Sequence, residues 1–219
     1  MSFQALDVLD FSNGHVYYTQ QLPQKLNHTP YMVHQTFQFG GTPGNDRFRE
    51  AMLWLADDDV WYDPPGGLLV YDHVADPALF EPRTVENHFR LINAQLSQFR
   101  TAWALSRALN RTLVMPRLLC GFDRAWFPHD GRFPGSDELF TLPFACPADH
   151  VFDLEAWQRL GVLGQLRESS LMDNPRMPVS VKHSVATVSF VFNPHAQDIT
   201  RRTFDGACRW GLCRRDAVS

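Results

Sequence analysis

The residues best suited to chemistry lie near the N-terminus, where a predicted strand runs into a glycine-rich loop. In YMVHQTFQF, residues 31–39, apolar and polar side chains alternate, which predicts a strand with His34, Thr36 and Gln38 on its polar face. Neutral imidazole binds divalent metals such as Mn²⁺, with carboxylates supplying most of the affinity. His34 is therefore a candidate metal ligand, and the alternative is a histidine hydrogen-bonded within a sheet.

The loop after this strand has the composition of an anion-binding turn. It reads GGTPGND (40–46), and a short helix is predicted at 47–56. Backbone N–H groups at a helix start are unpaired, the helix dipole favours negative charge there, and glycines let the backbone approach closely. Two arginines in the helix point in different directions, so we expect one at most to reach a ligand. The candidate phosphate-binding residues are Gly40, Gly41, Gly44, Arg47 and Arg49.

Residues 84–109 hold the longest regular pattern in the chain. Their apolar side chains recur at spacings of three and four, which predicts an amphipathic helix with Val85, Phe89, Ile92, Leu96, Phe99 and Trp103 on one face. Thr84 is the predicted N-cap, and Asn110 ends the helix in a left-handed turn. RTLVMP (111–116) then predicts a buried strand, and such a unit is typical of α/β sheets. Polar residues near this helix and strand could form a second ligand site, but ordinary α/β packing explains them better. They are Asn93, Gln95, Arg100 and Arg111.

The remaining segments predict strands and helices on either side of one boundary. Residues 6–39 are predicted as strands with short turns, including HVYYTQ at 15–20. A helix is expected at 156–167 and a strand at 185–192. The proline-containing, loop-like sequence at 57–83 indicates a boundary between two structural units. The predicted organisation is a first unit at 1–66, a linker at 67–83, a second small α/β unit at 84–195 and a flexible tail at 196–219.

The composition of the chain excludes several classes of protein. Of 219 residues, 44% are hydrophobic and 20% are charged, which is typical of a globular protein. The net charge of −4 argues against a nucleic-acid-binding surface. No apolar run approaches the roughly 20 residues that a transmembrane helix needs. The start, SFQALDVLDF, lacks the features of a signal peptide, so we expect no targeting segment in this chain.

Two of the four cysteines, Cys120 and Cys146, bracket a loop-rich stretch. No CxxC pair occurs, so a zinc ribbon is not expected. In an oxidising compartment the two residues form a disulfide, and otherwise they are free buried thiols. Both alternatives stay open at the level of sequence.

Four longer segments carry a resemblance to a known family. They are VHQTFQFGGTPGNDRFREAMLW (33–54), YDPPGG (62–67), ALNRTLVMPRLLCGFDRAWF (108–127) and CPADHVFD (146–153). Together they resemble the plant and algal arabinosyltransferases of glycosyltransferase family 77, in a match that is collinear along most of the chain. The resemblance implies an α/β fold: the C-terminal part of a GT-A-type nucleotide-diphospho-sugar transferase domain, followed by a second small α/β unit.

The resemblance also implies a chemistry and its ligands. The donor would be a UDP-sugar, with Mn²⁺ or Mg²⁺ bridging its diphosphate, and the sugar, arabinose in these relatives, would pass to a hydroxyl with retention at the anomeric carbon. His34 would bind the metal. No residue is assigned as nucleophile or base. The donor diphosphate would be held by Gly41, Gly44, Arg47 and Arg49.

The resemblance implies partners and a location as well. The acceptor would be a hydroxyproline-rich cell-wall glycoprotein or a glycan. Full-length relatives are type II membrane proteins of the Golgi lumen, so this chain would meet the membrane only through an N-terminal anchor that it lacks. No nucleic-acid partner is expected.

Two departures from the family's pattern favour an alternative function. The family's metal-binding Asp-x-Asp lies upstream of residues 33–54, and this chain begins after that point. The family's Gly-Lys-Arg is Gly44-Asn45-Asp46 here, so two basic residues are replaced by an amide and an acid. The alternative is a non-catalytic accessory or acceptor-binding module derived from such an enzyme.

Two other groups of acidic residues have simpler explanations than catalysis. The run Asp57-Asp58-Asp59 follows a predicted helix rather than a buried strand and lies outside the family's motif positions, so we interpret it as a solvated acidic loop. Asp149 and His150 form a possible acid–base pair, but a loop hydrogen bond is the simpler interpretation.

Overall fold

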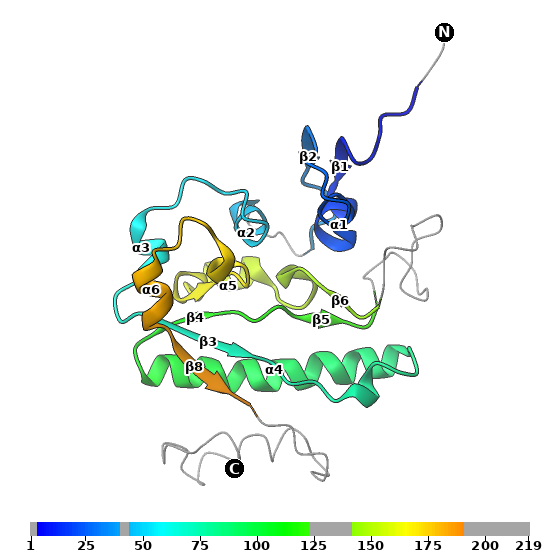
Figure 1. Ribbon diagram of the computed structural model, residues 1–219. Coiled ribbons are helices and arrows are strands. Elements are labelled where there is room, and N and C mark those ends of the chain that lie inside the picture. The colour runs from blue at the N-terminus through cyan, green and yellow to red at the C-terminus, as the bar shows by residue number, and fades with distance from the viewer. Residues whose placement is uncertain (1–3, 40–43, 123–141, 191–219) are drawn as a thin grey trace.

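The computed structural model describes residues 4–39, 44–122 and 142–190, which form an α/β protein with parallel sheets, as the sequence predicts. The largest sheet has four parallel strands in the order β7-β4-β3-β8. Figure 1 shows β3, β4 and β8 with the long helix α4 (Val85–Ala108) running along them. The four strands are β3 (Leu68–Asp72), β4 (Thr112–Val114), β7 (Leu166–Arg167) and β8 (Ala186–Ser189).

Hydrophobic layers cover both faces of this sheet. Successive residues of a strand point to opposite faces, so Leu69 packs on the side of α4, and Leu68 packs on the other side. The first layer also contains α5 (Leu154–Arg159), where Trp157 stacks on Phe99 of α4. The second layer consists of α3 (Asp59–Tyr62), the 3₁₀ helix η5 (Leu171–Asp173) and α6 (Val179–Ser184). Burial on both faces explains the continuous apolar run at the start of β3.

Helix α4 begins and ends where the sequence predicts. The hydroxyl of Thr84 accepts a hydrogen bond from the backbone N–H of Asn87 at 3.1 Å, which caps the helix. At the other end Asn110 has a left-handed φ of 51°. The chain then enters β4, which confirms the predicted strand at 111–116.

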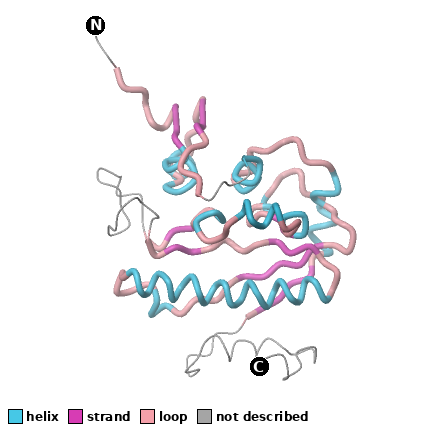
Figure 2. The backbone as a smooth tube through the Cα atoms, turned by 180° about the vertical axis from the view of Figure 1, so that it is seen from behind, coloured by secondary structure: helices cyan, strands magenta, loops and turns pink. Residues whose placement is uncertain are grey.

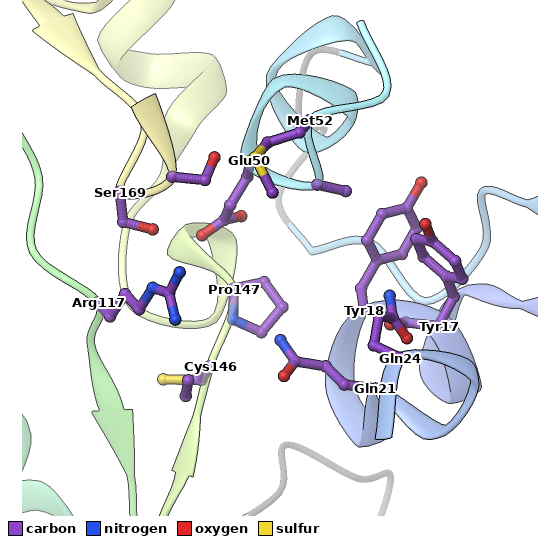
Figure 3. A pocket seen from close by; sticks show the side chains of 13 residues that line it. Tyr17, Tyr18, Gln21, Gln24, Glu50, Met52, Arg117, Cys146, Pro147 and Ser169 are labelled. Carbon is purple, nitrogen blue, oxygen red and sulfur yellow. The ribbon is translucent and has the colours of Figure 1, made fainter. Parts of the chain in front are cut away.

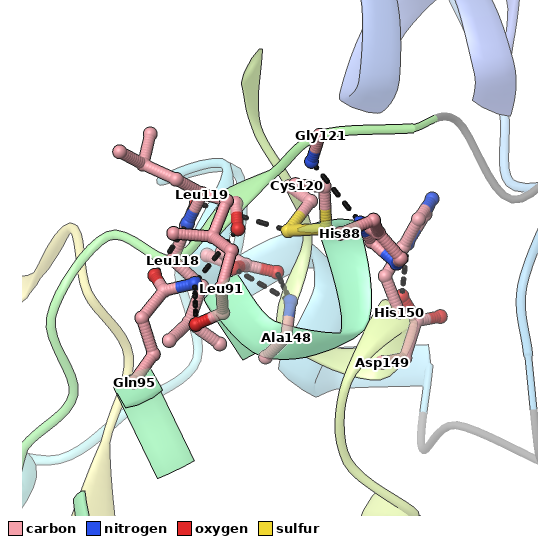
Figure 4. The surroundings of a disulfide bond; sticks show 12 residues. His88, Leu91, Gln95, Leu118, Leu119, Cys120, Gly121, Ala148, Asp149 and His150 are labelled. Carbon is pink, nitrogen blue, oxygen red and sulfur yellow. Dashed lines mark hydrogen bonds and ion pairs between the residues drawn. A yellow bond between two sulfur atoms is a disulfide. The ribbon is translucent and has the colours of Figure 1, made fainter. Parts of the chain in front are cut away.

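The buried face of α4 differs from the predicted apolar face. Phe89 is 59% exposed, whereas Gln95 and Gln98 are buried. The Gln98 amide pairs with the backbone N–H and C=O of Val74 at 2.8 and 2.6 Å, and the Gln95 amide pairs with those of Leu119, both at 2.8 Å (Figure 4). Because each of these amides is hydrogen-bonded, burying it does not destabilise the fold. Periodicity cannot reveal them, because each partner lies 24 residues away.

Strand β3 lies inside the range 67–83 that the sequence predicts as a linker, although it is a central strand of the sheet. The YDPPGG turn before it places Gly66 and Gly67 at φ values of 87° and 77°. Glycine adopts this region without steric penalty. A Cβ on Gly66 would lie 2.1 Å from the backbone oxygen of Asn110, so the turn requires a glycine where β3 meets the end of α4.

We expect Gly66→Ala to lower the free energy of unfolding by about 2–4 kcal/mol, because it adds backbone strain and a clash with a backbone atom. Urea denaturation measures the change. Gly164→Ala is the matched control: no atom lies within 4 Å of a Cβ there. We expect it to change the unfolding free energy by less than about 0.5 kcal/mol. Equal stabilities of the two variants would contradict the argument.

The N-terminal residues depart most from the predicted strands. Two short parallel strands, β1 (Phe11–Asn13) and β2 (Met32–His34), stand apart from the four-stranded sheet in both views (Figures 1 and 2). The predicted strand at 15–20 is wrong, because HVYYTQ forms the π-helix η1 (His15–Gln20). This helix buries five consecutive residues, whereas a half-buried strand buries alternate ones. The short helix α1 (Leu22–Lys25) follows.

Later elements are shorter than predicted. The strand expected at 31–39 ends at His34, and Phe37 has a left-handed φ of 59° that a strand cannot contain. Helix α2 (Gly44–Glu50) begins inside the glycine loop and ends six residues before the predicted end at residue 56. Strand β8 confirms the strand expected at 185–192, with fewer residues. The helix expected at 156–167 is only partly confirmed, because α5 ends at Arg159 and Leu166–Arg167 form strand β7 instead.

The disulfide between Cys120 and Cys146 decides between the two alternatives for these cysteines. It links β5 (Leu119–Cys120) to the residue after β6 (Phe144–Ala145), and the two strands pair antiparallel. Figure 4 shows the bond close to the start of α4. The covalent link therefore ties the segment after β4 to the segment that leads into α5.

The limits of the predicted units stay predictions. The tail at 196–219 lies outside the described residues. The units at 1–66 and 84–195 touch in the structure, because Phe39 and Arg47 of the first both bond to Asp149 of the second. In the part of the chain that the structure describes, no helix has the length and apolar character to cross a membrane.

Candidate functional site

The predicted metal ligand His34 is the last residue of β2 and is exposed. Its backbone pairs in register with Asn13. Thr36 and Gln38 do not continue a polar face with it, because the strand ends at His34. The hydroxyl of Thr36 instead accepts a hydrogen bond from the backbone N–H of Gly14 at 3.1 Å. The structure therefore leaves His34 accessible, and its metal-binding role stays a prediction.

The predicted phosphate-binding loop lies only partly within the described residues. Gly40 and Gly41 fall outside them, and Gly44 is the first residue of α2. Helix α2 has seven residues, so its dipole is weaker than that of a long helix. The role of these glycines stays a prediction.

Arg47, a predicted diphosphate ligand, is buried and bonded to the protein. Its side chain is 1% exposed and forms an ion pair with the Asp149 carboxylate. The same guanidinium nitrogen donates a hydrogen bond to the backbone oxygen of Phe37 at 3.2 Å and the guanidinium lies 4.8 Å from the centre of the Tyr18 ring. Asp149 also accepts a hydrogen bond from the backbone N–H of Phe39 at 3.1 Å. A carboxylate therefore occupies the position that a phosphate would take on this nitrogen.

Asp149 and His150 form a buried hydrogen bond rather than an exposed acid–base pair. Both side chains are 1% exposed, and 3.2 Å separates His150 Nδ1 from Asp149 Oδ1. Burial would raise the pKa of Asp149, but the hydrogen bond from His150 and the charge of Arg47 outweigh it and lower this pKa to about 2. Asp149 is therefore ionised at neutral pH and serves as the anionic centre of a packed cluster.

Arg49, the second predicted arginine, is also held by carboxylates. Its Nε lies 3.0 Å from both carboxylate oxygens of Asp57, and its NH1 lies 3.0 Å from Asp46. The guanidinium stacks on the Trp61 ring at 3.7 Å. Asp57 is therefore a paired, buried residue rather than a solvated one, and Asp58 caps α3. These contacts support the view that the acidic run is not an Asp-x-Asp metal site.

A cavity of about 300 Å³ lies where α2 faces η1, α1 and the segment from β6 to the 3₁₀ helix η3 (Ala148–His150), and we call it the α2 pocket. Its volume is at the lower end of the range for small-molecule sites. Figure 3 shows Glu50, Arg117 and Ser169 on one side of it, with Gln21 reaching in from the side of η1 and α1. The lining combines hydroxyl, amide, carboxyl and guanidinium groups from Tyr17, Tyr18, Gln21, Gln24, Glu50, Arg117, Ser169 and Ser170.

Glu50 is the one acidic residue among the described residues that line the α2 pocket. Its carboxylate accepts hydrogen bonds from the backbone N–H of Ala148 at 3.0 and 3.3 Å. Burial raises its pKa to about 7, against the opposing charge of Arg47. A carboxyl group that titrates near neutral pH beside a polar cavity is able to accept or donate a proton during a reaction. Glu50 is therefore the acid–base candidate of this site.

Sequence reasoning missed Glu50, although it stands in the REAM part of the family-like segment at 33–54. Its environment depends on Ala148, which lies 98 residues away. The tyrosines of the pocket were missed because HVYYTQ reads as a strand. A strand would place Tyr17 and Tyr18 on opposite faces, whereas η1 buries both.

We expect Glu50→Gln to remove part of the pH dependence of stability. The raised pKa means that folded Glu50 keeps its proton between about pH 4.5 and pH 7, where the unfolded residue loses it. Stability therefore falls as pH rises through this window, by about 1–3 kcal/mol for this group. Urea denaturation at pH 5 and pH 8 measures the difference between wild type and variant. The exposed Glu86→Gln is the control, and a Glu50 variant that keeps the full wild-type slope would refute the assignment.

Comparison with known proteins shows which protein family this chain is related to. The chain is 41% identical over 183 residues to a protein named arabinosyltransferase XEG113 from Arabidopsis thaliana. The chain is a relative of the arabinosyltransferases of glycosyltransferase family 77. The matched residues are 80% of this chain and 28% of that protein, so the chain spans little more than a quarter of the relative's length. No family model and no solved structure matches the chain.

In this arabinosyltransferase relative, the described residues alone do not form a metal site. Among residues 4–39, 44–122 and 142–190, no group of three or more His, Cys, Asp or Glu side chains is arranged to hold an ion. His34 would supply one ligand at most, and a hard cation such as Mg²⁺ or Mn²⁺ prefers several oxygen ligands. A metal would need carboxylates from outside these residues, so no reaction step is assigned to it here.

Proposed function

We propose that this chain is part of a glycosyltransferase that moves arabinose from a UDP-sugar to a hydroxyl of a cell-wall glycoprotein or glycan, with retention at the anomeric carbon. The identity to a protein named arabinosyltransferase over most of the chain carries the proposal. The α2 pocket supports it, because its hydroxyl, amide and carboxyl groups suit a polyhydroxylated ligand.

In this proposal the α2 pocket orients the sugar and the acceptor hydroxyl. For retention, the acceptor oxygen bonds to the anomeric carbon on the same face from which the diphosphate leaves, while the bond from that carbon to the diphosphate oxygen breaks. Ionised Glu50, with its pKa of about 7, takes the proton of the hydroxyl. The backbone N–H of Ala148 holds its carboxylate in place.

The diphosphate end of the donor is proposed to lie toward α2. Two nitrogens of Arg47, Nε and NH1, are buried without a hydrogen-bond partner among the described residues. They would donate to phosphate oxygens once the segment that buries them moves aside. Gly41, Gly44, Arg49 and His34 are the further proposed contacts, His34 through Mn²⁺ or Mg²⁺. That ion would neutralise charge on the leaving diphosphate when bound.

The Golgi lumen is the proposed location. The disulfide between Cys120 and Cys146 supports an oxidising compartment, because such bonds rarely persist in the cytosol. Non-reducing electrophoresis of alkylated protein from the native cell tests this. Free thiols at both positions would argue against the lumen.

The test of the transferase is a transfer assay with UDP-arabinose, Mn²⁺ and a hydroxyproline-rich peptide. We expect arabinose on the peptide, and a rate at least about 100-fold lower for Glu50→Gln. Glu86→Gln is the matched control at an exposed position and is expected to keep the wild-type rate. Equal rates for the two variants would remove Glu50 from the mechanism.

A non-catalytic acceptor-binding module is the second candidate. It is favoured by the carboxylates that hold Arg47 and Arg49, and by Asn45 in place of the family's lysine. Titration with UDP and Mn²⁺ separates the two functions. Heat that disappears in His34→Ala supports the transferase. Peptide binding without any heat from UDP supports the module.

A further inference from the structure

A second cavity, of about 450 Å³, lies at the carboxyl ends of the parallel strands, and we call it the strand-end crevice. Asp72 and His73 come from the end of β3 and the residue after it, Arg117 follows β4, and Ser169 follows β7. In open α/β sheets, ligands bind outside the carboxyl ends of the strands, where the strand order reverses. The crevice occupies that edge of this sheet.

The topology places Asp72 and His73 at the reversal itself. From β3 the chain moves to β4 and then to β7 on one side, and it returns to place β8 on the other side of β3. Asp72 pairs in register with Ser189 of β8. Neither the Asp72 nor the His73 side chain has a hydrogen-bond partner among the described residues, so both are available to a ligand.

The charges of the crevice disfavour a phosphate or another anion. It contains two carboxylates, Asp72 and Asp173, and one guanidinium, Arg117, which already pairs with Asp173 at 2.6 Å. Burial lowers the pKa of His73 despite the nearby charge of Asp72, so the imidazole is neutral at pH 7. The sequence after β3 is HVADP, with no glycine loop to cradle a phosphate, and α4 does not begin until Val85.

The same groups suit an uncharged ligand with many hydroxyls. The Asp72 carboxylate accepts hydrogen bonds, neutral His73 both donates and accepts one, and Ser169 does both. Apolar side chains complete the lining, from Val70, Val114, Met115, Pro116 and Met172. A sugar ring presents hydroxyls at its edge and C–H groups on its face, so it matches both kinds of surface.

We propose that the strand-end crevice is a carbohydrate-binding site, separate from the α2 pocket, that takes an uncharged sugar unit of a glycan. Arg117 and Ser169 line both cavities, so a glycan held in the crevice would lie next to the α2 pocket. Its use as an acceptor site rests on the proposed transferase function. The binding itself rests only on the crevice.

The test is isothermal titration of the full chain with arabinotriose, without UDP or metal. We expect saturable binding that weakens about tenfold or more in Asp72→Asn and in His73→Ala, since each removes hydrogen bonds to the sugar. Asp72 is exposed, so its variant is expected to fold, and thermal unfolding checks this. Glu50 does not line the crevice, so Glu50→Gln is expected to bind the trisaccharide as wild type does.

Several outcomes would overturn the proposal: no binding at the solubility limit of the trisaccharide, equal binding in the crevice variants, or loss of binding in Glu50→Gln. In a separate titration with UDP, binding that is weaker in Asp72→Asn or in His73→Ala would show that the crevice is a nucleotide site instead. The titration measures binding and not sugar transfer, so its result can be interpreted even if the chain is inactive as a transferase. Likewise, absence of trisaccharide binding would not contradict the proposed transferase function.

Discussion

Replacing Asp149 with alanine is expected to lower the free energy of unfolding by about 3–5 kcal/mol. The residue is the only described carboxylate that joins Phe39, Arg47 and His150, and its side chain is 1% exposed. Without it, the buried Arg47 guanidinium loses its ion-pair partner, and the nearby Glu50 is only partly ionised at pH 7. Breaking one half of a buried ion pair is more damaging than removing an exposed pair, because the remaining charge cannot reach water.

Urea denaturation at pH 7 measures the loss for Asp149→Ala. Glu155→Ala is the matched control, since Glu155 pairs with Arg159 at 2.7 Å on an exposed helix face. We expect it to change stability by about 0.5 kcal/mol or less. The double variant Arg47→Met with Asp149→Leu is expected to recover part of the loss, because it leaves no unpaired charge. A loss below about 1 kcal/mol for Asp149→Ala would contradict the role assigned to this cluster.

The lowered pKa of Asp149 adds a pH dependence of opposite sign to that of Glu50. The depressed value of about 2 means that the ionised form stabilises the fold above about pH 4, and this contribution is lost as pH falls toward pH 2. Wild-type protein should therefore lose stability on acidification through this window. Asp149→Asn should lose less over the same range, which acid titration by circular dichroism measures.

The parts of the fold that follow from the sequence are those set by local interactions. Thr84 caps α4 through a residue three positions away, and Asn110 ends the helix by its own tolerance of a left-handed φ. The apolar run of β4 is likewise a local signal. HVYYTQ predicts a strand because its residues are β-formers, but it forms η1, which buries five consecutive residues.

The candidate site follows from the sequence only in part, because its decisive contacts are long-range. Arg47 and Asp149 are 102 residues apart, and Glu50 and Ala148 are 98 apart. The family-like segments at 33–54 and 146–153 contain all four residues, so the resemblance pointed to the right stretches of chain. The sequence alone could not show that these two stretches face each other, or that the arginines already hold carboxylates.

Loss of the disulfide is expected to be the second large effect, at about 3–4 kcal/mol for Cys120→Ala with Cys146→Ala. The bond closes a loop with a sequence separation of 26, and the loop-closure entropy that it removes from the unfolded chain corresponds to about that amount. Thermal and urea unfolding measure the change. The wild type should become less stable on addition of a reductant, and the double variant should not respond.

The disulfide also positions the α2 pocket, so its loss should affect function beyond stability. Cys146 and Pro147 line that pocket, and the next residue, Ala148, donates the hydrogen bond that holds Glu50. If the bond fixes this segment, its loss lets the Glu50 carboxyl contact more water, and its pKa should move from about 7 toward the ordinary value of 4.5. Comparison of the pH dependence of unfolding between the double variant and Glu50→Gln tests this. Steep loss of stability between pH 5 and pH 8 in the double variant, as in wild type, would show that the pocket keeps its shape without the disulfide.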